Sequence, residues 1–272
     1  MSKLLRKIKL HADDIGATKE VNRNILKSID NGVVKSVSII VNGYALDHAV
    51  QAIRARKINS YIHFNLTFGK PLSNNILVKK YLCDKDGFFN TNFVKLLFYN
   101  FYLSKDRREN LKKAIKLELE KQLNLYLDKT RNNKIFVDGH EHFHLIPIIS
   151  DIILSLNKRY NIFKIKIPKE KINITDLLNI FNIKNIIKVL VLNTLSWRFL
   201  RKIKFTNIKY NKFFIGVLNT NNMNIKNIKK SIKILNIKDL NELMILVHPG
   251  YASKKEKKYF KKCLILNPKY PL

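Results

Sequence analysis

The chain has 272 residues, with 52 Lys or Arg against 20 Asp or Glu, which gives a formal net charge of +32 at pH 7 when His is neutral. Hydrophobic residues make up 46% of the chain, but no apolar run reaches the roughly 18 residues of a membrane-spanning helix. The N-terminal stretch lacks the apolar segment of a signal peptide, and the two cysteines, Cys83 and Cys263, belong to no CxxC pair. We therefore expect a reduced, cytoplasmic protein without a disulfide framework.

Strand patterns alternate with helix patterns along the chain. Strands are expected at residues 5–12, 33–43, 60–69, 134–138, 163–168 and 242–250, and helices at 18–32, 45–56, 106–128 and 147–160. This alternation predicts a parallel sheet with crossover helices. The element order of the low-complexity segment 171–240 cannot be read from its pattern. Because no Pro-, Gly- or Ser-rich linker divides the chain, we expect a single domain over residues 1–272.

The strong positive charge has two interpretations. It can attract nucleic acid, an anionic membrane surface or an acidic glycan. It can also reflect an AT-rich coding sequence, since Lys is enriched together with Asn and Ile in segments 179–188 and 222–238. The basic residues are spread along the chain and follow no nucleic-acid-binding motif. We therefore expect no nucleic-acid partner, while peripheral contact with an anionic membrane stays open.

Acidic or histidine side chains follow four of the predicted strands. Asp13 and Asp14 lie in the predicted turn after the first strand, His63 ends the third, and His140 and His248 follow two later strands. Active sites of α/β sheets and barrels form at the carboxyl ends of their strands. The four positions therefore predict one shared site. A set of two His and one Asp suits a divalent cation with open positions for water and substrate.

Residues 138–144, DGHEHFH, carry three of the seven histidines. The spacing differs from HExxH, whose two histidines share one face of a helix. Gly139 and the nearby Pro147 favour a loop, so we expect one histidine to bind the cation and the other two to support it. Two adjacent acids such as Asp13 and Asp14 can have different roles: one binds the cation and the other acts as a general base.

Four ordered segments, 11–43, 63–73, 137–147 and 247–251, resemble the YdjC-like carbohydrate deacetylases, the family of chitooligosaccharide deacetylase. The resemblance implies an irregular (β/α) barrel related to polysaccharide deacetylases. It also implies hydrolysis of the N-acetyl group of an amino sugar with one divalent metal ion, Mg²⁺ or Zn²⁺. Three residues depart from the family pattern without removing an implied ligand: His11, Ile15 and Glu141.

The resemblance also implies a role for each site residue. The metal ligands are Asp14, His63 and His140. Asp13 is the general base, and His248 is the general acid by analogy with the related deacetylases. The residues expected to contact the sugar are His144, Lys70 and Tyr251.

The sequence alone leaves other functions open. A basic, non-catalytic protein that binds nucleic acid or an anionic glycan would also carry a high positive charge. Such a binding function does not explain the His and Asp residues at the strand ends. The same fold can also act on a lipid-linked sugar at a membrane. A homodimer is left open as well.

Overall fold

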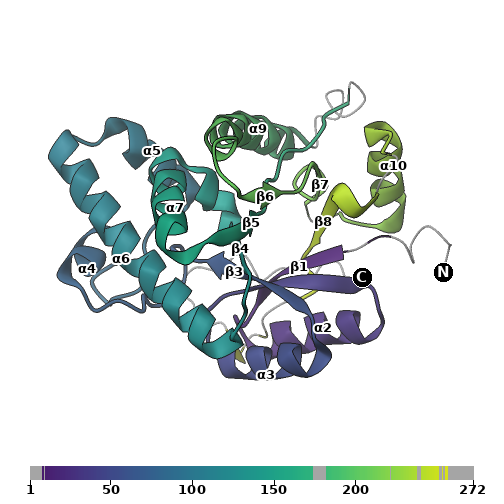
Figure 1. The fold of residues 1–272 in the computed structure, drawn as a ribbon, viewed down its shortest axis with the longest axis horizontal. Helices are drawn as coiled ribbons and strands as arrows, with labels where there is room; N and C mark the ends of the chain where they lie inside the picture. The colour runs from purple at the N-terminus through teal and green to yellow at the C-terminus, as the bar shows by residue number, and fades with distance from the viewer. Residues whose placement is uncertain are drawn as a thin grey trace.

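The computed structural model describes residues 8, 10–173, 182–220, 222–237, 240–250, 253, 255 and 256. In this part of the chain one curled, fully parallel sheet has helices packed around its outer surface (Figure 1). Its strands are β1 (Leu10–Ile15), β2 (Val34–Ile39), β3 (Asn59–Phe64), β4 (Ile135–Gly139), β5 (Ile162–Ile165), β6 (Lys209–Tyr210), β7 (Phe213–Ile215) and β8 (Leu243–Val247).

The helices connect the strands as crossovers. The α-helices are α2 (Lys19–Asp30), α3 (Leu46–Arg56), α4 (Ile76–Leu82), α5 (Phe93–Tyr102), α6 (Lys105–Thr130), α7 (Pro147–Tyr160), α9 (Ile183–Ile203) and α10 (Ile225–Leu235). Two 3₁₀ helices, η1 (His140–Leu145) and η3 (Leu240–Glu242), flank β4 and β8. Among the residues described, no helix combines the length and the apolar character needed to cross a membrane.

The sheet nearly closes on itself. Its strand order is β6-β5-β4-β3-β2-β1-β8-β7, so β6 and β7 lie at opposite edges although only two residues separate them in the chain. The short run 209–215 therefore pairs with β5 at its start and with β8 at its end. Between the two pairings, the Asn211 amide bonds both the N–H and the C=O of Ile167 at 2.8 Å. The predicted irregular (β/α) barrel with parallel strands is confirmed.

Local sequence signals explain the elements that the pattern predicts well. The Thr18 hydroxyl accepts a hydrogen bond from the Val21 N–H at 3.1 Å and caps the start of α2, whose apolar face is buried. Pro147 occupies the first turn of α7, where the missing N–H costs no hydrogen bond. Both helices therefore begin within a residue of their predicted starts.

One prediction of local structure near the site is wrong. Residues 13–15 belong to strand β1 instead of a turn, because Asp13 and Asp14 find buried partners inside the barrel. The expected loop at residues 140–144 holds short 3₁₀ turns in η1, interrupted by the non-helical residues Glu141 and His142, with φ angles of 52° and 60°. In segment 171–240 the structure describes α9, β6, β7 and α10.

Candidate active site

A bulge in β1 brings two adjacent acids to the same place. In a regular strand, neighbouring side chains point to opposite faces of the sheet. Ala12 and Ile15 pair with Val37 and Ile39 of β2, so β1 holds one extra residue between these pairings. Asp14 accommodates the bulge with a φ of 75°, a left-handed conformation that is uncommon for residues other than glycine. Both carboxylates are therefore buried at the carboxyl end of β1.

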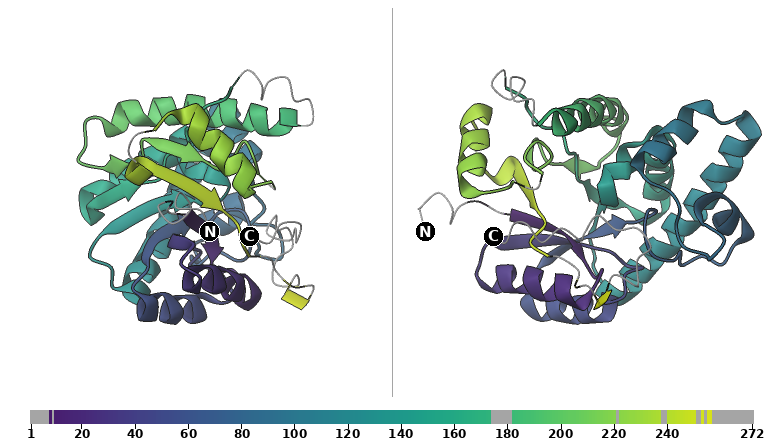
Figure 2. Two further views of the ribbon diagram at one scale, coloured as in Figure 1. Left: turned by 90° about the vertical axis from the view of Figure 1, so that its right-hand side faces the viewer. Right: turned by 180° about the vertical axis from the view of Figure 1, so that it is seen from behind.

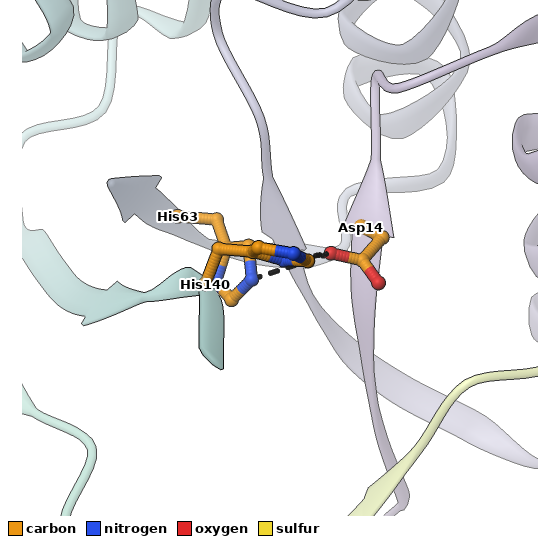
Figure 3. A group of neighbouring side chains, drawn as sticks. All are labelled: Asp14, His63 and His140. Carbon is orange, nitrogen blue, oxygen red and sulfur yellow. Dashed lines mark hydrogen bonds and ion pairs between the residues drawn. The ribbon is translucent and has the colours of Figure 1, made fainter. Parts of the chain in front are cut away.

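Asp14 lies against His63 of β3 and His140, the first residue of η1 (Figure 3). Its Oδ1 is 3.0 Å from His140 Nδ1 and 3.3 Å from His63 Nε2. One ligand atom of each residue falls within 4.8 Å of the others, and all three side chains are buried. Two nitrogen donors and one carboxylate oxygen at this spacing fit one divalent cation. The structure thus brings together the three residues expected to bind metal.

Asp138 orients His63 from the other side of the ring. Its Oδ1 accepts a hydrogen bond from His63 Nδ1 at 2.6 Å, which leaves Nε2 directed toward Asp14. Its Oδ2 accepts a 2.5 Å hydrogen bond from the Ser38 hydroxyl. A carboxylate that holds the second nitrogen of a histidine fixes the tautomer and the ring orientation that a metal site needs.

Asp13 has a different partner, the fully buried side chain of Lys166. Lys166 Nζ lies 2.8 Å from both oxygens of Asp13, and it also pairs with Asp138 Oδ2. His11, Asp13 and Asp138 form a second group whose geometry suits a cation, and the Lys166 ammonium already contacts both of its carboxylates. The two adjacent acids of β1 thus face different partners.

Opposite charges determine the protonation of this cluster. Burial alone raises the pKa of Asp13, but Lys166 and His63 outweigh it and hold that pKa well below the usual value. The pKa of Asp14 is also lowered, because His140 and His63 outweigh the effect of burial. Burial lowers the pKa of His63, but Asp138 and Asp13 outweigh it and raise that pKa to about 10. Both acids of β1 are therefore ionised at neutral pH.

Comparison with known proteins identifies the family. The family model described as YdjC-like protein matches residues 7–266, nearly the whole chain. The chain belongs to this family. Its resemblance in the four sequence segments is thus confirmed over a much longer stretch.

Curated relatives of this chain carry deacetylase names. A carbohydrate deacetylase of Clostridium beijerinckii is 30% identical over 154 residues, which cover 56% of this chain and 57% of the relative. A chitooligosaccharide deacetylase of Escherichia fergusonii is 31% identical over 54% of this chain and 53% of its own length. A human carbohydrate deacetylase is 27% identical over 63% of this chain and 51% of its own. The chain thus matches about half the length of these relatives.

A solved structure supports the fold alone. A protein of Enterococcus faecalis, named for cellobiose-phosphate cleavage, superimposes with a TM-score of 0.65 at 15% sequence identity. The match covers 93% of this chain and 84% of the other. This chain therefore shares its fold with the Enterococcus faecalis protein over almost its full length.

Two polar residues of α6 position the loop that follows His63. The Gln122 side chain bonds both the N–H and the C=O of Asn65, at 2.9 and 2.6 Å. One turn earlier, the Glu118 carboxylate accepts hydrogen bonds from the N–H groups of Leu72 and Ser73, at 3.0 and 2.9 Å. Because both side chains are completely buried, α6 fixes residues 65–73 at the edge of the site.

Two other residues of the histidine segment, His144 and Glu141, have hydrogen-bond partners outside the three proposed ligands. His144 is completely buried, and its Nε2 bonds the carbonyl oxygen of Lys166 at 2.8 Å. Burial lowers the pKa of His144 to about 4, so its ring is neutral at pH 7. Glu141 Oε2 accepts a 3.2 Å hydrogen bond from the N–H of Phe93 at the start of α5. His144 thus supports the strand end that carries Lys166, and its contact with substrate stays a prediction.

The other predicted site residues lie around this cluster. His248 follows β8, is half exposed, and places Nε2 4.0 Å from Asp14 Oδ2. Lys70 lies in the loop anchored by α6, with its ammonium 5.0 Å from the centre of the Phe88 ring. Tyr251 lies outside the described residues. The structure therefore brings His248 to the cluster. The ammonium of Lys70 lies over the ring of Phe88.

The sequence pattern did not single out Lys166 as a site residue. The signal was present, because Lys166 stands at the carboxyl end of a predicted strand, at the same edge as Asp13 and His140. The enrichment of Lys throughout the chain obscured it. A lysine that is buried in a parallel sheet requires an acid as its partner, but the pattern of residues 163–168 does not show which of Lys164 and Lys166 is buried.

Proposed function

We propose that this YdjC-like protein is a metal-dependent hydrolase that removes the N-acetyl group of an N-acetylated amino sugar and releases acetate. The single observation that carries the proposal is that the two adjacent acids of β1 contact different partners. Asp14 faces His63 and His140, whereas Asp13 faces Lys166. The names of the curated relatives support the reaction class.

Asp14, His63 and His140 would hold one divalent cation. Zn²⁺ accepts this donor set, and Mg²⁺ is the alternative that keeps more oxygen ligands. A bound cation of this kind polarises a carbonyl oxygen and lowers the pKa of water. Asp138 keeps His63 Nε2 directed toward Asp14 through its 2.6 Å hydrogen bond to Nδ1.

Asp13 would accept the proton of the attacking water. Its Oδ2 lies 3.9 Å from His63 Nε2, so the carboxylate borders the three ligand atoms without joining them. Lys166 fixes the carboxylate in place and keeps it ionised. A general base must be deprotonated and within reach of the proton that it takes, and Asp13 meets the first condition because of Lys166.

His248 would donate a proton to the departing nitrogen as the carbon–nitrogen bond breaks. The products are then acetate and a free amine, and the water supplies the oxygen and the protons that they require. Nε2 of His248 lies 4.0 Å from Oδ2 of Asp14, whereas His63 and His140 lie against Oδ1. Its half-exposed side chain can meet a substrate that enters from solvent. His144, Lys70 and Tyr251 are the proposed contacts to the sugar, which is either soluble or lipid-linked.

Acetate release tests this function. Purified protein is incubated with a panel of N-acetylated mono- and oligosaccharides, with added Zn²⁺ or Mg²⁺ and with a chelator. We expect release from at least one member of the panel, lost with the chelator and restored by the metal. Release that survives complete removal of metal would reject the metal-dependent reaction.

A further inference from the structure

Helix α9 has a composition unlike the other long helix of the barrel. Its 21 residues include five basic side chains and no acidic one. Helix α6, in contrast, mixes lysines with Asp and Glu along its length. The five basic residues of α9 are Lys184, Lys188, Arg198, Arg201 and Lys202.

Helix α9 is apolar on two faces. One face is buried against the rest of the barrel through Ile186, Val189, Leu192, Leu195, Phe199 and Ile203. The opposite face carries Ile183, Ile187, Leu190 and Trp197, each more than half exposed. These four lie at spacings of four, three and seven residues, which places them in one stripe along the helix. An ordinary surface helix has a single apolar stripe that faces the core.

The exposed stripe lies at the periphery of the molecule. Figure 2 (left) shows α9 running along the outer edge of the structure, on the far side of the barrel from α2 and α3. Trp197 is 57% exposed, and the guanidinium of Arg201 lies 4.9 Å from its ring centre. Just beyond the helix, Phe205 is 86% exposed. A large apolar surface thus faces solvent, bordered by exposed Lys184, Lys188 and Arg198.

We propose that the outer stripe of α9 docks the protein onto an anionic lipid bilayer, lying parallel to the membrane surface. Helices that bind in this way place Trp, Phe and Leu at the level of the acyl chains and Lys or Arg at the headgroups. The absence of acidic residues from α9 and the chain charge of +32 complement the negative surface of such a bilayer. The proposal concerns location and is independent of the reaction in the barrel.

Charge argues against the other occupants of this surface. A second copy bound through α9 would place two helices with five basic residues each, and no acid, against one another. Nucleic acid would satisfy the charges, but it would leave the exposed Ile and Leu side chains without an apolar partner. Helix α5 serves as a contrast, because Val94, Phe98 and Phe101 are also exposed there while Lys95 is its only charged residue.

The chain provides its own reporter, since Trp197 is its only tryptophan. Full-length protein is titrated with vesicles of equal parts phosphatidylglycerol and phosphatidylcholine, and with vesicles of phosphatidylcholine alone. We expect a blue shift of Trp197 emission with the anionic vesicles. We also expect binding at least roughly tenfold tighter than to the neutral vesicles, weakening as salt is added.

Two matched pairs of variants separate the α9 surface from general charge. Ile187→Glu/Leu190→Glu and Val94→Glu/Phe101→Glu each replace two exposed apolar residues and change the net charge equally. Lys184→Gln/Lys188→Gln and Lys112→Gln/Lys116→Gln each remove two lysines four residues apart, on α9 and α6 respectively. We expect the α9 member of each pair to lose most of the vesicle binding and the other member to keep it. If the Glu substitutions disturb folding, vesicle binding by the two Gln variants still tests the proposal.

Several outcomes would overturn the proposal. One is equal loss of binding in both members of a pair, which would assign the effect to net charge. Another is the absence of a Trp197 blue shift with anionic vesicles. A third is wild-type self-association that disappears in the α9 variants while vesicle binding does not change, which would assign the surface to a second copy. Binding of duplex DNA or single-stranded RNA that replaces vesicle binding and disappears in the same variants would assign it to nucleic acid.

Discussion

Lys166 Nζ lies 2.8 Å from both carboxylate oxygens of Asp13, and it also pairs with Asp138. All three groups are buried, so the ammonium is the internal counter-charge of two acids. We predict that Lys166→Met lowers the free energy of unfolding by about 3–5 kcal/mol, because it leaves buried carboxylates without their partner. Urea unfolding measures this change.

Lys164→Met is the control for that variant. Lys164 lies two residues earlier in the same chain segment and is only partly buried. We expect its substitution to change the free energy of unfolding by less than about 1 kcal/mol. Equal effects of the two substitutions would contradict the pairing of Lys166 with Asp13 and Asp138.

Asp138 is predicted to control metal affinity without binding the metal. Asp138→Asn weakens the hold on His63 Nδ1, now a 2.6 Å hydrogen bond to a carboxylate. Loss of such an orienting partner lowers metal affinity by about 10–100-fold. Competition for Zn²⁺ with a chromogenic chelator measures the change. Asp128→Asn, on the exposed surface of α6, is the control, and unchanged affinity in Asp138→Asn would count against the orienting role.

His144 is predicted to make stability depend on acidity. Burial lowers its pKa to about 4, whereas an unfolded histidine has a pKa of about 6.5. The unfolded chain therefore binds the proton first as pH falls, and the folded state loses roughly 2–3 kcal/mol between pH 7 and pH 4. Unfolding free energies at these two pH values should differ by less in His144→Gln than in the wild type. His48→Gln, on the exposed face of α3, should behave as the wild type does.

Glu118 is predicted to hold the loop beside the site. Its two oxygens accept the N–H groups of Leu72 and Ser73 separately, so the amide of Glu118→Gln would turn a donor toward one of them. A buried N–H without an acceptor costs about 1–3 kcal/mol. Thermal or urea unfolding measures the cost, and Glu109→Gln, exposed on the same helix, is the control. Equal stability of the two variants would show that the loop does not depend on Glu118.

Periodicity and the order of elements were sufficient to predict a parallel sheet with crossover helices and the meeting of four strand ends. The barrel itself was implied by the resemblance to the family. The bulge at Asp14 was not predicted, since it depends on pairing with β2, which is distant in the chain. The strands that close the barrel were also missed. β6 and β7 have two and three residues, too few for an alternating pattern to appear.

The central claim is that Asp13 and Asp14 have separate tasks, and two variants measured side by side test it most directly. Metal content and acetate release are determined for wild type, Asp13→Asn and Asp14→Asn, on a substrate that the wild type hydrolyses. We predict that Asp14→Asn loses both metal and activity. Asp13→Asn should keep its metal while acetate release falls by about 10²–10⁴-fold, as for loss of a general base. Undiminished acetate release by Asp13→Asn, or metal loss equal to that of Asp14→Asn, would contradict the account.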